Sequence, residues 1–264
     1  GCIPILVFNP HPFKVKQLIE CEFNLPDINW NDVFTDVYVH KGKRALPCQV
    51  EHEMGSSSLD WRKKAVFWAE LDPCQMNRFD CATEVLDRKP PAVLKTKRGR
   101  IVFRTKDLEI VINTGTGLVD KYKIKGVDSI RPNAFEPIVM KDIEDSWIVS
   151  GKSFREIAGR FKLMDKKTGS IFSGLGKSNL ESVRIIEDGP ARSIVEALFS
   201  YNNSFICQHY KLPKYGTEIE VEIRVYWNEK TRMLKLSIPI VGKDIKYLGQ
   251  VAYGVEELPD NGNE

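Results

Sequence analysis

The stretch Glu218-Ile219-Glu220-Val221-Glu222-Ile223-Arg224-Val225-Tyr226-Trp227 alternates apolar residues with polar or charged ones, and it decides the fold. Successive side chains of a β-strand point to opposite faces, so this segment buries one face and wets the other. Similar runs occupy residues 193–199, 205–212 and 234–238, and turn-forming residues separate them at 187–190, 201–204, 213–216 and 228–230. Connections this short favour antiparallel neighbours, so residues 183–239 are predicted to form an antiparallel meander.

The first third of the chain also has β character, but its strands are expected to be shorter. The candidate strands cover residues 3–8, 14–23, 36–40, 45–51, 65–71 and 81–86. Residues 41–44 are typical of a hairpin loop, and Lys89-Pro90-Pro91 begins a stretch that breaks regular ladders. The sequence therefore predicts an all-β protein with two domains. Residues 1–92 form a small immunoglobulin-like sandwich, and residues 93–264 form a large antiparallel sandwich.

Several segments together carry a family resemblance. They are Val7–Phe13 (VFNPHPF), Val183–Arg192 (VRIIEDGPAR), Tyr210–Pro213 (YKLP), the 218–228 strand, Leu234–Leu236 (LKL) and Tyr253–Glu256 (YGVE). In combination they resemble the β-rich half of bacterial glycoside hydrolase family 38 α-mannosidases, which follows the catalytic domains. The resemblance spans essentially the whole chain.

The resemblance implies that this chain is the non-catalytic part of a longer enzyme. The large sandwich would be a supersandwich of the galactose-mutarotase type, cut short at its C-terminal end. The catalytic barrel would precede Gly1 and would hold a divalent metal, with zinc expected. No metal ligand or catalytic residue of the family can then be carried onto this chain, and the chain alone is expected to be inactive. Strands missing after Glu264 would leave open edges and favour self-association.

The bulk composition excludes some function classes. Lys plus Arg numbers 39 against 36 for Asp plus Glu, a formal charge of +3 that gives no reason to expect a nucleic-acid partner. No apolar run approaches the roughly 20 residues of a membrane helix, so no membrane partner is expected. The six cysteines are scattered without a Cys-x-x-Cys pair, which favours reduced thiols and a cytoplasmic location.

One acidic segment is a candidate for sugar contact. Asp142, Glu144 and Asp145 precede Trp147, and paired carboxylates cleave glycosidic bonds, although three acids within four residues are typical of a solvated loop. The resemblance matches Asp145-Ser146-Trp147 to an Asp-small-Trp motif of bacterial members. It therefore implies that Asp145 and Trp147 flank the substrate, with the indole stacked on a sugar. Ile148-Val149-Ser150 departs from the Gly-His that many members carry there, which weakens the inference.

Other motifs favour ordinary structural roles. The four histidines lack the short spacings of a zinc site. Residues 113–117 (NTGTG) lack the Gly-Lys-Ser/Thr ending of a phosphate loop and are predicted to be a β-turn. Trp68 is predicted to be core or half-buried, on the same strand face as Val66 and Glu70, whereas the role of Trp61 stays open.

Three functions remain open from the sequence. The first is the non-catalytic region of an α-mannosidase that hydrolyses terminal α-mannosides of a mannose-containing oligosaccharide, bracing the missing catalytic domain. The second is a stand-alone carbohydrate-binding module, which the fold alone permits. The third is a mutarotase-like sugar epimerase, for which His209 with Glu196 or Glu220 is the pairing worth naming.

Overall fold

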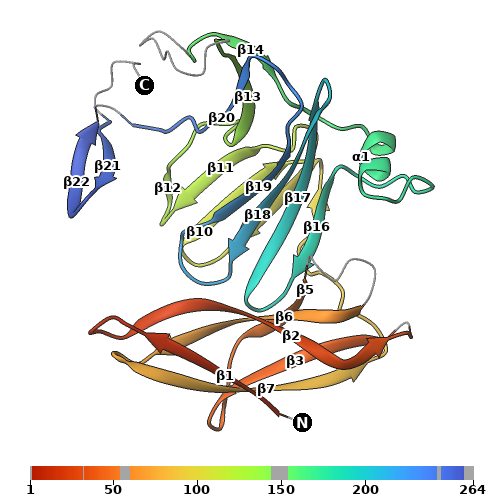
Figure 1. Ribbon diagram of the computed structural model, residues 1–264, viewed down its shortest axis with the longest axis vertical. Helices are drawn as coiled ribbons and strands as arrows, with labels where there is room; N and C mark the ends of the chain where they lie inside the picture. The colour runs from red at the N-terminus through yellow and green to blue at the C-terminus, as the bar shows by residue number, and fades with distance from the viewer. Residues whose placement is uncertain (1, 32, 54–59, 144–153, 243–244, 259–264) are drawn as a thin grey trace. The chain divides into compact units, whose positions relative to one another are not determined.

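The computed structural model describes residues 2–31, 33–53, 60–143, 154–242 and 245–258. Its elements in the first half are β1 (Cys2–Asn9), β2 (Val15–Asn29), β3 (Phe34–Lys41), β4 (Arg44–Ala45), β5 (Cys48–His52), β6 (Asp60–Leu71), β7 (Gln75–Leu86), β8 (Thr96–Lys97), β9 (Arg100–Arg104), β10 (Leu108–Asn113), β11 (Val119–Ile124) and β12 (Val127–Asp128). The second half holds β13 (Glu136–Lys141), β14 (Ile157–Arg160), β15 (Lys162–Leu163), α1 (Lys166–Phe172), β16 (Val183–Asp188), β17 (Arg192–Tyr201), β18 (Ser204–Pro213), β19 (Glu220–Tyr226), β20 (Arg232–Ser237), β21 (Tyr247–Val251) and β22 (Gly254–Leu258). Strands dominate the described residues, so the predicted all-β class is confirmed (Figure 1).

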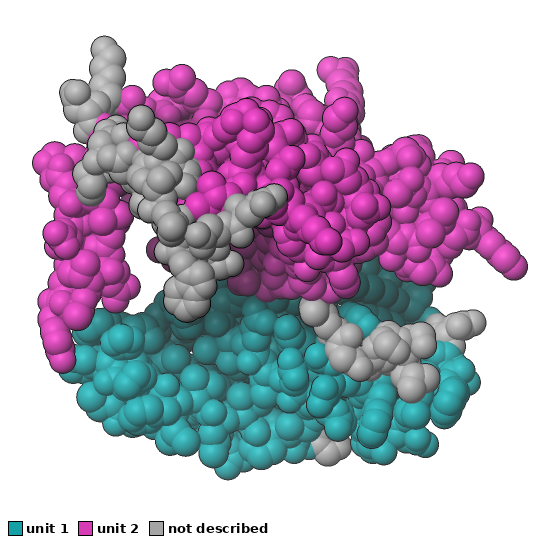
Figure 2. All heavy atoms as spheres, turned by 45° about the horizontal axis from the view of Figure 1, so that its top comes forward, with its two compact units in different colours: residues 1–93, 187–193, 213–215 teal, residues 94–186, 194–212, 216–264 magenta. Residues whose placement is uncertain are grey.

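The chain divides into two compact units, coloured separately in Figure 2. Unit 1 comprises Gly1–Val93 together with the short segments Glu187–Ser193 and Pro213–Tyr215. Unit 2 comprises Leu94–Ile186, Ile194–Leu212 and Gly216–Glu264.

Unit 1 contains a sandwich of two antiparallel sheets, ordered β1-β7-β3-β4 and β2-β6-β5 (red to orange in Figure 1). Alternate residues of each strand face inward, as the period of two requires. The buried core side chains are Ile5, Val37, Val39, Val50, Ala65, Phe67, Ala69, Leu71, Phe79 and Cys81. The strand expected over residues 45–51 is instead two strands, because the chain crosses from one sheet to the other at Leu46-Pro47: β4 pairs with β3, whereas β5 pairs with β6.

A buried arginine holds the segment Glu187–Ser193 within unit 1. The guanidinium of Arg192 is 2% exposed and makes two parallel hydrogen bonds to the Glu51 carboxylate, at 2.8 and 2.6 Å. Its third nitrogen donates to Glu20 at 2.5 Å. Gln49 accepts the backbone N–H groups of Ala191 and Arg192 at 3.0 Å and donates to Glu51 at 2.8 Å. The charges and backbone groups buried here are therefore paired with one another.

Unit 2 is built from larger antiparallel sheets. One has the order β12-β11-β10-β9-β8, and another has the order β15-β17-β18-β19 with β16 beside β17. Their facing side chains form the main core, which includes Ile101, Phe103, Ile110, Ile112, Val195, Ala197, Phe199, Ile206, Tyr210 and Leu212. The alternating residues that defined the sequence pattern behave as expected, because Ile219, Val221 and Ile223 pack against this core. The predicted β-sandwich is thus confirmed.

The meander differs from the expected one at its fourth strand. Strands β16 to β19 lie in one sheet, but β20 pairs with β13 in a three-stranded sheet ordered β14-β13-β20. Leu234 and Leu236 face Val139 and Pro137 of β13 across this ladder. The chain leaves the meander at Thr231, whose φ of +51° bends it away from β19.

A turn is present at residues 113–117 as predicted, but its closing hydrogen bond spans five residues, so it is an α-turn instead of the expected β-turn. Gly117 N–H donates to the Asn113 carbonyl at 2.8 Å, and the Asn113 side chain accepts the Gly115 N–H at 2.9 Å. Gly117 has a φ of +75°, and its carbonyl accepts the buried Tyr210 hydroxyl at 2.8 Å. A glycine here satisfies both the left-handed backbone and the close approach of the core.

Two further features complete the description. The two-stranded hairpin β21–β22 has only one half-buried residue, Gly249, and its large apolar side chains are exposed (blue in Figure 1). Within the described ranges, no helix is long and apolar enough to cross a membrane.

Candidate functional site

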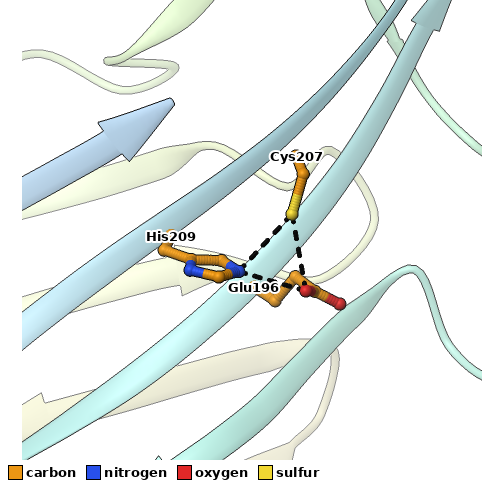
Figure 3. Close-up of side chains that lie close together, drawn as sticks. All are labelled: Glu196, Cys207 and His209. Carbon is orange, nitrogen blue, oxygen red and sulfur yellow. Dashed lines mark hydrogen bonds and ion pairs between the residues drawn. The ribbon is translucent and has the colours of Figure 1, made fainter. Parts of the chain in front are cut away.

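The outward face of the β16–β19 sheet carries a compact group of reactive side chains. Residues two apart on a strand face the same way, so Cys207 and His209 of β18 lie on one face, which Glu196 of β17 shares. His209 Nε2 lies 3.1 Å from Glu196 Oε2 and 3.4 Å from Cys207 Sγ, and the thiol lies 3.4 Å from the same carboxylate oxygen (Figure 3). Their opposite strand neighbours face the main core, which fixes the backbone beneath the group. We call these three residues the Glu196–Cys207–His209 cluster.

Two arginines surround this cluster. Arg184 of β16 forms an ion pair with Glu196 Oε1 and donates to the Ser173 hydroxyl at 2.9 Å. Arg224 of β19 approaches from the other side, with Nη2 3.2 Å from His209 Nε2 and 3.4 Å from Cys207 Sγ. The β18–β19 register explains this approach, because Cys207 stands directly opposite Arg224. The cluster therefore lies between two guanidinium groups, with Arg184 on the carboxylate and Arg224 on the histidine and the thiol.

The surroundings set the protonation states of the cluster. Burial raises the pKa of the Glu196 carboxyl, but hydrogen bonding to His209 and the Arg184 charge outweigh it and lower the pKa to about 2. Burial, reinforced by the Glu196 charge, raises the pKa of the Cys207 thiol to about 12. At neutral pH the cluster therefore contains a carboxylate and an un-ionised thiol.

A single proton position on His209 cannot satisfy both neighbours. If Nε2 carries the proton, it donates to Glu196 and cannot accept from Arg224. If Nε2 is bare, it accepts from Arg224 but meets the carboxylate with a lone pair. The Glu196 side chain is 12% exposed and its pKa is low, so the tautomer that donates to the carboxylate is favoured. Arg224 Nη2 then donates to Cys207 Sγ.

The distances between the possible ligand atoms of Glu196, Cys207 and His209 also resemble those within a metal site. One atom from each of the three residues lies within 4.8 Å of the others, and Cys, His and Glu are all zinc ligands. However, a zinc ion would need these donor atoms to point at one shared position, whereas they are already hydrogen-bonded to one another. The Arg224 nitrogen also lies 3.2 Å from His209 Nε2, where it would repel a cation. The geometry therefore fits an ion-paired polar cluster better than a metal centre.

The residue pair considered for epimerase chemistry is only partly brought together. His209 contacts Glu196, whereas Glu220 stands opposite Lys211 and accepts from its ammonium at 2.6 Å. A general acid and base acting on a sugar should both face the bound ring. His209 and Glu196 instead face one another, with side chains 10% and 12% exposed.

The substrate-flanking residues inferred from the sequence are not part of this cluster. Asp145 and Trp147 lie outside the described residues, as does Glu144. Sequence reasoning paired His209 with Glu196 but missed the contributions of Cys207, Arg184 and Arg224. The hairpin register between 205–212 and 219–226 was the available signal, because it sets Arg224 opposite Cys207.

Comparisons with known proteins bear on the whole chain. Residues 165–264 match the family model described as "Glycosyl hydrolases family 38 C-terminal domain". No curated protein matches the chain. A solved α-mannosidase from Enterococcus faecalis V583 superposes with a TM-score of 0.59 at 11% identity, covering 100% of this chain and 34% of that one. A glycosyl hydrolase family 38 protein from Enterococcus faecalis gives a TM-score of 0.62 at 10% identity, covering 98% and 35%. The chain thus spans about a third of the length of these two proteins, and the likeness shows a shared fold.

Proposed function

Because residues 165–264 match the model of the glycosyl hydrolase family 38 C-terminal domain, we propose that this chain is the non-catalytic β region of an α-mannosidase that hydrolyses terminal α-mannosides. The observation that carries the proposal is this family match, within a fold whose full length corresponds to one third of an α-mannosidase. The role of the two sandwiches is to brace a catalytic domain, and the substrate is a mannose-containing oligosaccharide.

The polar chemistry of unit 2 supports a bracing role. The Glu196–Cys207–His209 cluster is neutralised by Arg184 and its members contact one another, so it has the character of internal scaffolding. A divalent metal, with zinc expected, belongs in this proposal to the catalytic domain outside this chain.

Asp145 and Trp147 are proposed to flank the sugar from this region. A tryptophan ring offers apolar area to pyranose C–H groups, and an adjacent carboxylate accepts hydroxyl hydrogen bonds. In a longer protein that includes the catalytic domain, we expect Trp147→Ala to raise KM for a mannoside with little change in kcat. An unchanged KM would remove this residue from the pocket.

The cellular setting is also part of the proposal. All six cysteines are free, and burial raises the pKa of Cys81 to about 11. Unpaired thiols suit a reducing compartment, so we propose a bacterial cytoplasmic enzyme. The exposed apolar hairpin β21–β22 supports self-association of the isolated chain, which light scattering over a wide concentration range tests. A monodisperse monomer would contradict it.

The central experiment is hydrolysis of an aryl α-mannoside. The purified chain is expected to give no turnover with or without added zinc, whereas a longer protein with the preceding region should hydrolyse the substrate and lose activity to a chelator. Metal-dependent turnover by the chain alone would overturn the non-catalytic assignment. Mutarotation of a free sugar, lost on His209→Asn, would instead support the epimerase alternative, for which the His209–Glu196 contact is the one favourable observation.

A further inference from the structure

Unit 1 contains a cavity on its surface. It has a volume of about 330 Å³ and opens over the outer face of the β2–β6 pair. In this ladder Lys16 stands opposite Glu70, and Leu18 stands opposite Trp68, so Lys16, Trp68 and Glu70 share that face. Tyr215, from the segment Pro213–Tyr215, forms another part of the wall. The cavity is of a size that accepts a small ligand.

Two aromatic rings form a fixed wall of this cavity. Trp68 and Tyr215 meet edge to face, with ring centroids 5.7 Å apart and planes at 70°. The indole is held in place because Nε1 donates to the Ala191 carbonyl at 2.8 Å. The Tyr215 side chain is 40% exposed, so part of its surface faces the solvent. Because the rings are already held in place, a ligand that packs against their apolar area does not have to order these side chains when it binds.

The charges around the cavity are unbalanced. Lys14, Lys16, Lys41 and Arg44 line it, against the two carboxylates Glu70 and Asp72.

Asp72 already pairs with two of these cations. It contacts Lys14 at 3.1 Å and Lys41 at 2.9 Å. The Lys41 ammonium also donates to the Glu70 carbonyl and to Asn77, at 3.1 and 3.2 Å, which uses its three donors. Two of the four cations are therefore held by Asp72, and the other two have no such contact.

Lys16 and Arg44 are those two cations. Lys16 Nζ lies 4.1 Å from the centroid of the Tyr215 ring, although Glu70 stands opposite it in the ladder. Across the described part of the chain, neither Lys16 nor Arg44 forms an ion pair with a carboxylate. The same ammonium lies 6.0 Å from the Trp68 ring centroid, so among the described residues Lys16 contacts the aromatic wall but no carboxylate. The cavity therefore combines two cations without a carboxylate partner there, an aromatic wall and carboxylate acceptors.

We propose that this cavity binds an acidic sugar, a monosaccharide unit that carries a phosphate or carboxylate group. The anionic group lies between Lys16 and Arg44, the apolar face of the ring packs against Tyr215 and Trp68, and Glu70 accepts hydroxyl hydrogen bonds. An anion alone uses the cations but makes no use of the apolar area of the two rings. A neutral sugar uses the wall but leaves the two cations unpaired. This site is separate from the proposed bracing role, and its test does not involve hydrolysis.

The binding test is a calorimetric titration of the full chain with four probes: mannose 6-phosphate, glucuronate, methyl α-mannoside and inorganic phosphate. At least one acidic sugar is expected to bind ~10-fold more tightly than both the neutral mannoside and inorganic phosphate, because only the acidic sugar contacts both the cations and the aromatic wall. The ratio between the phosphate and carboxylate probes identifies which anionic group the site prefers.

Three variants locate the binding. Lys16→Gln and Arg44→Gln should each weaken the acidic sugar about 10-fold. Tyr215→Ala should weaken the sugar but leave inorganic phosphate unchanged. Lys97→Gln, an exposed lysine in unit 2, is the matched control and should bind like the unaltered chain. Circular dichroism checks that each variant is folded.

Several outcomes would overturn the proposal. Equal binding of inorganic phosphate and mannose 6-phosphate would reduce the cavity to a basic patch. Equal binding of methyl α-mannoside would remove the role of the charge. A loss of affinity in Lys97→Gln as large as in Lys16→Gln would show attraction by net charge alone. Absence of binding by all four probes would refute the site outright.

Discussion

Replacing Arg192 by methionine tests the idea that one buried cation organises unit 1. The substitution keeps a long apolar side chain but removes five N–H donors, three of which the structure assigns to acceptors on Glu51 and Glu20. The Glu51 side chain is 5% exposed, so its carboxylate loses its main counter-charge without gaining water.

The magnitude follows from this burial. Breaking a buried pair by removing one partner costs about 3–5 kcal/mol, since the remaining charge stays uncompensated. For unit 1 this corresponds to a melting temperature lower by at least ~10 °C. Tryptophan fluorescence with increasing temperature or urea measures the change. Arg100→Met, at an exposed arginine of β9, is the matched control and should shift stability by no more than about 0.5 kcal/mol.

A double variant separates charge from packing. Glu51→Gln combined with Arg192→Met removes the orphaned carboxylate, so part of the lost stability should return, with a coupling of about 1 kcal/mol or more. If Arg192→Met melts within 2 °C of the unaltered chain, or if the two substitutions simply add, the reasoning about a desolvated pair is refuted.

Three other outcomes are expected. The depressed pKa of Glu196 means that its contribution is present above about pH 4.5 and is lost as the pH falls toward 2, so the urea midpoints of the unaltered chain and Glu196→Gln should converge in acid; a constant gap would contradict this. A thiol reagent at pH 7 should label exposed Cys74 long before Cys207, whose pKa is raised to about 12, and urea should make all six thiols reactive; early labelling of Cys207 would argue against its burial. Gly117→Ala combines a φ of +75° with a Cβ 2.8 Å from a core ring and should cost about 2–4 kcal/mol, measured by urea unfolding. Gly126→Ala, with a φ of +87° and open space, should show the backbone cost alone, and an equal loss would rule out the core clash.

Much of the fold could be predicted from local patterning. The alternation at Ile219, Val221 and Ile223 identified the side chains that reach the main core, and the Asn113–Gly117 turn followed from its glycines and asparagine. These features depend on residues close together in the chain, where a period of two or a turn preference acts directly.

The predictions from sequence were wrong where a strand pairs with residues that are far away in the chain. The partner of β20 is β13, about a hundred residues earlier, and nothing in the Leu234–Leu236 pattern distinguishes that strand from β19. The crossing from one sheet to the other at Leu46-Pro47 was also missed, because β4 pairs with β3 and β5 with β6, and the apolar residues around Pro47 suggested one continuous strand.

The candidate site was only partly predictable for the same reason. His209 and Glu196 were named as a pair because histidine and glutamate are the usual acid and base, yet their burial and the flanking arginines depend on four strands meeting. The cavity in unit 1 needs residues from β2, β3, β4, β6 and the distant Tyr215, which no local pattern connects. Trp68 was correctly expected to be half-buried, but its neighbours were not foreseen.

The hairpin β21–β22 is expected to unfold locally before the sheets of the two sandwiches do. An isolated pair of strands gains little from burial and is only marginally stable in water. Its amide hydrogens should therefore exchange with deuterated solvent long before those of β17 and β18, whose side chains are mostly enclosed. A protease should likewise nick this ribbon first and leave the sandwich sheets intact as resistant bodies.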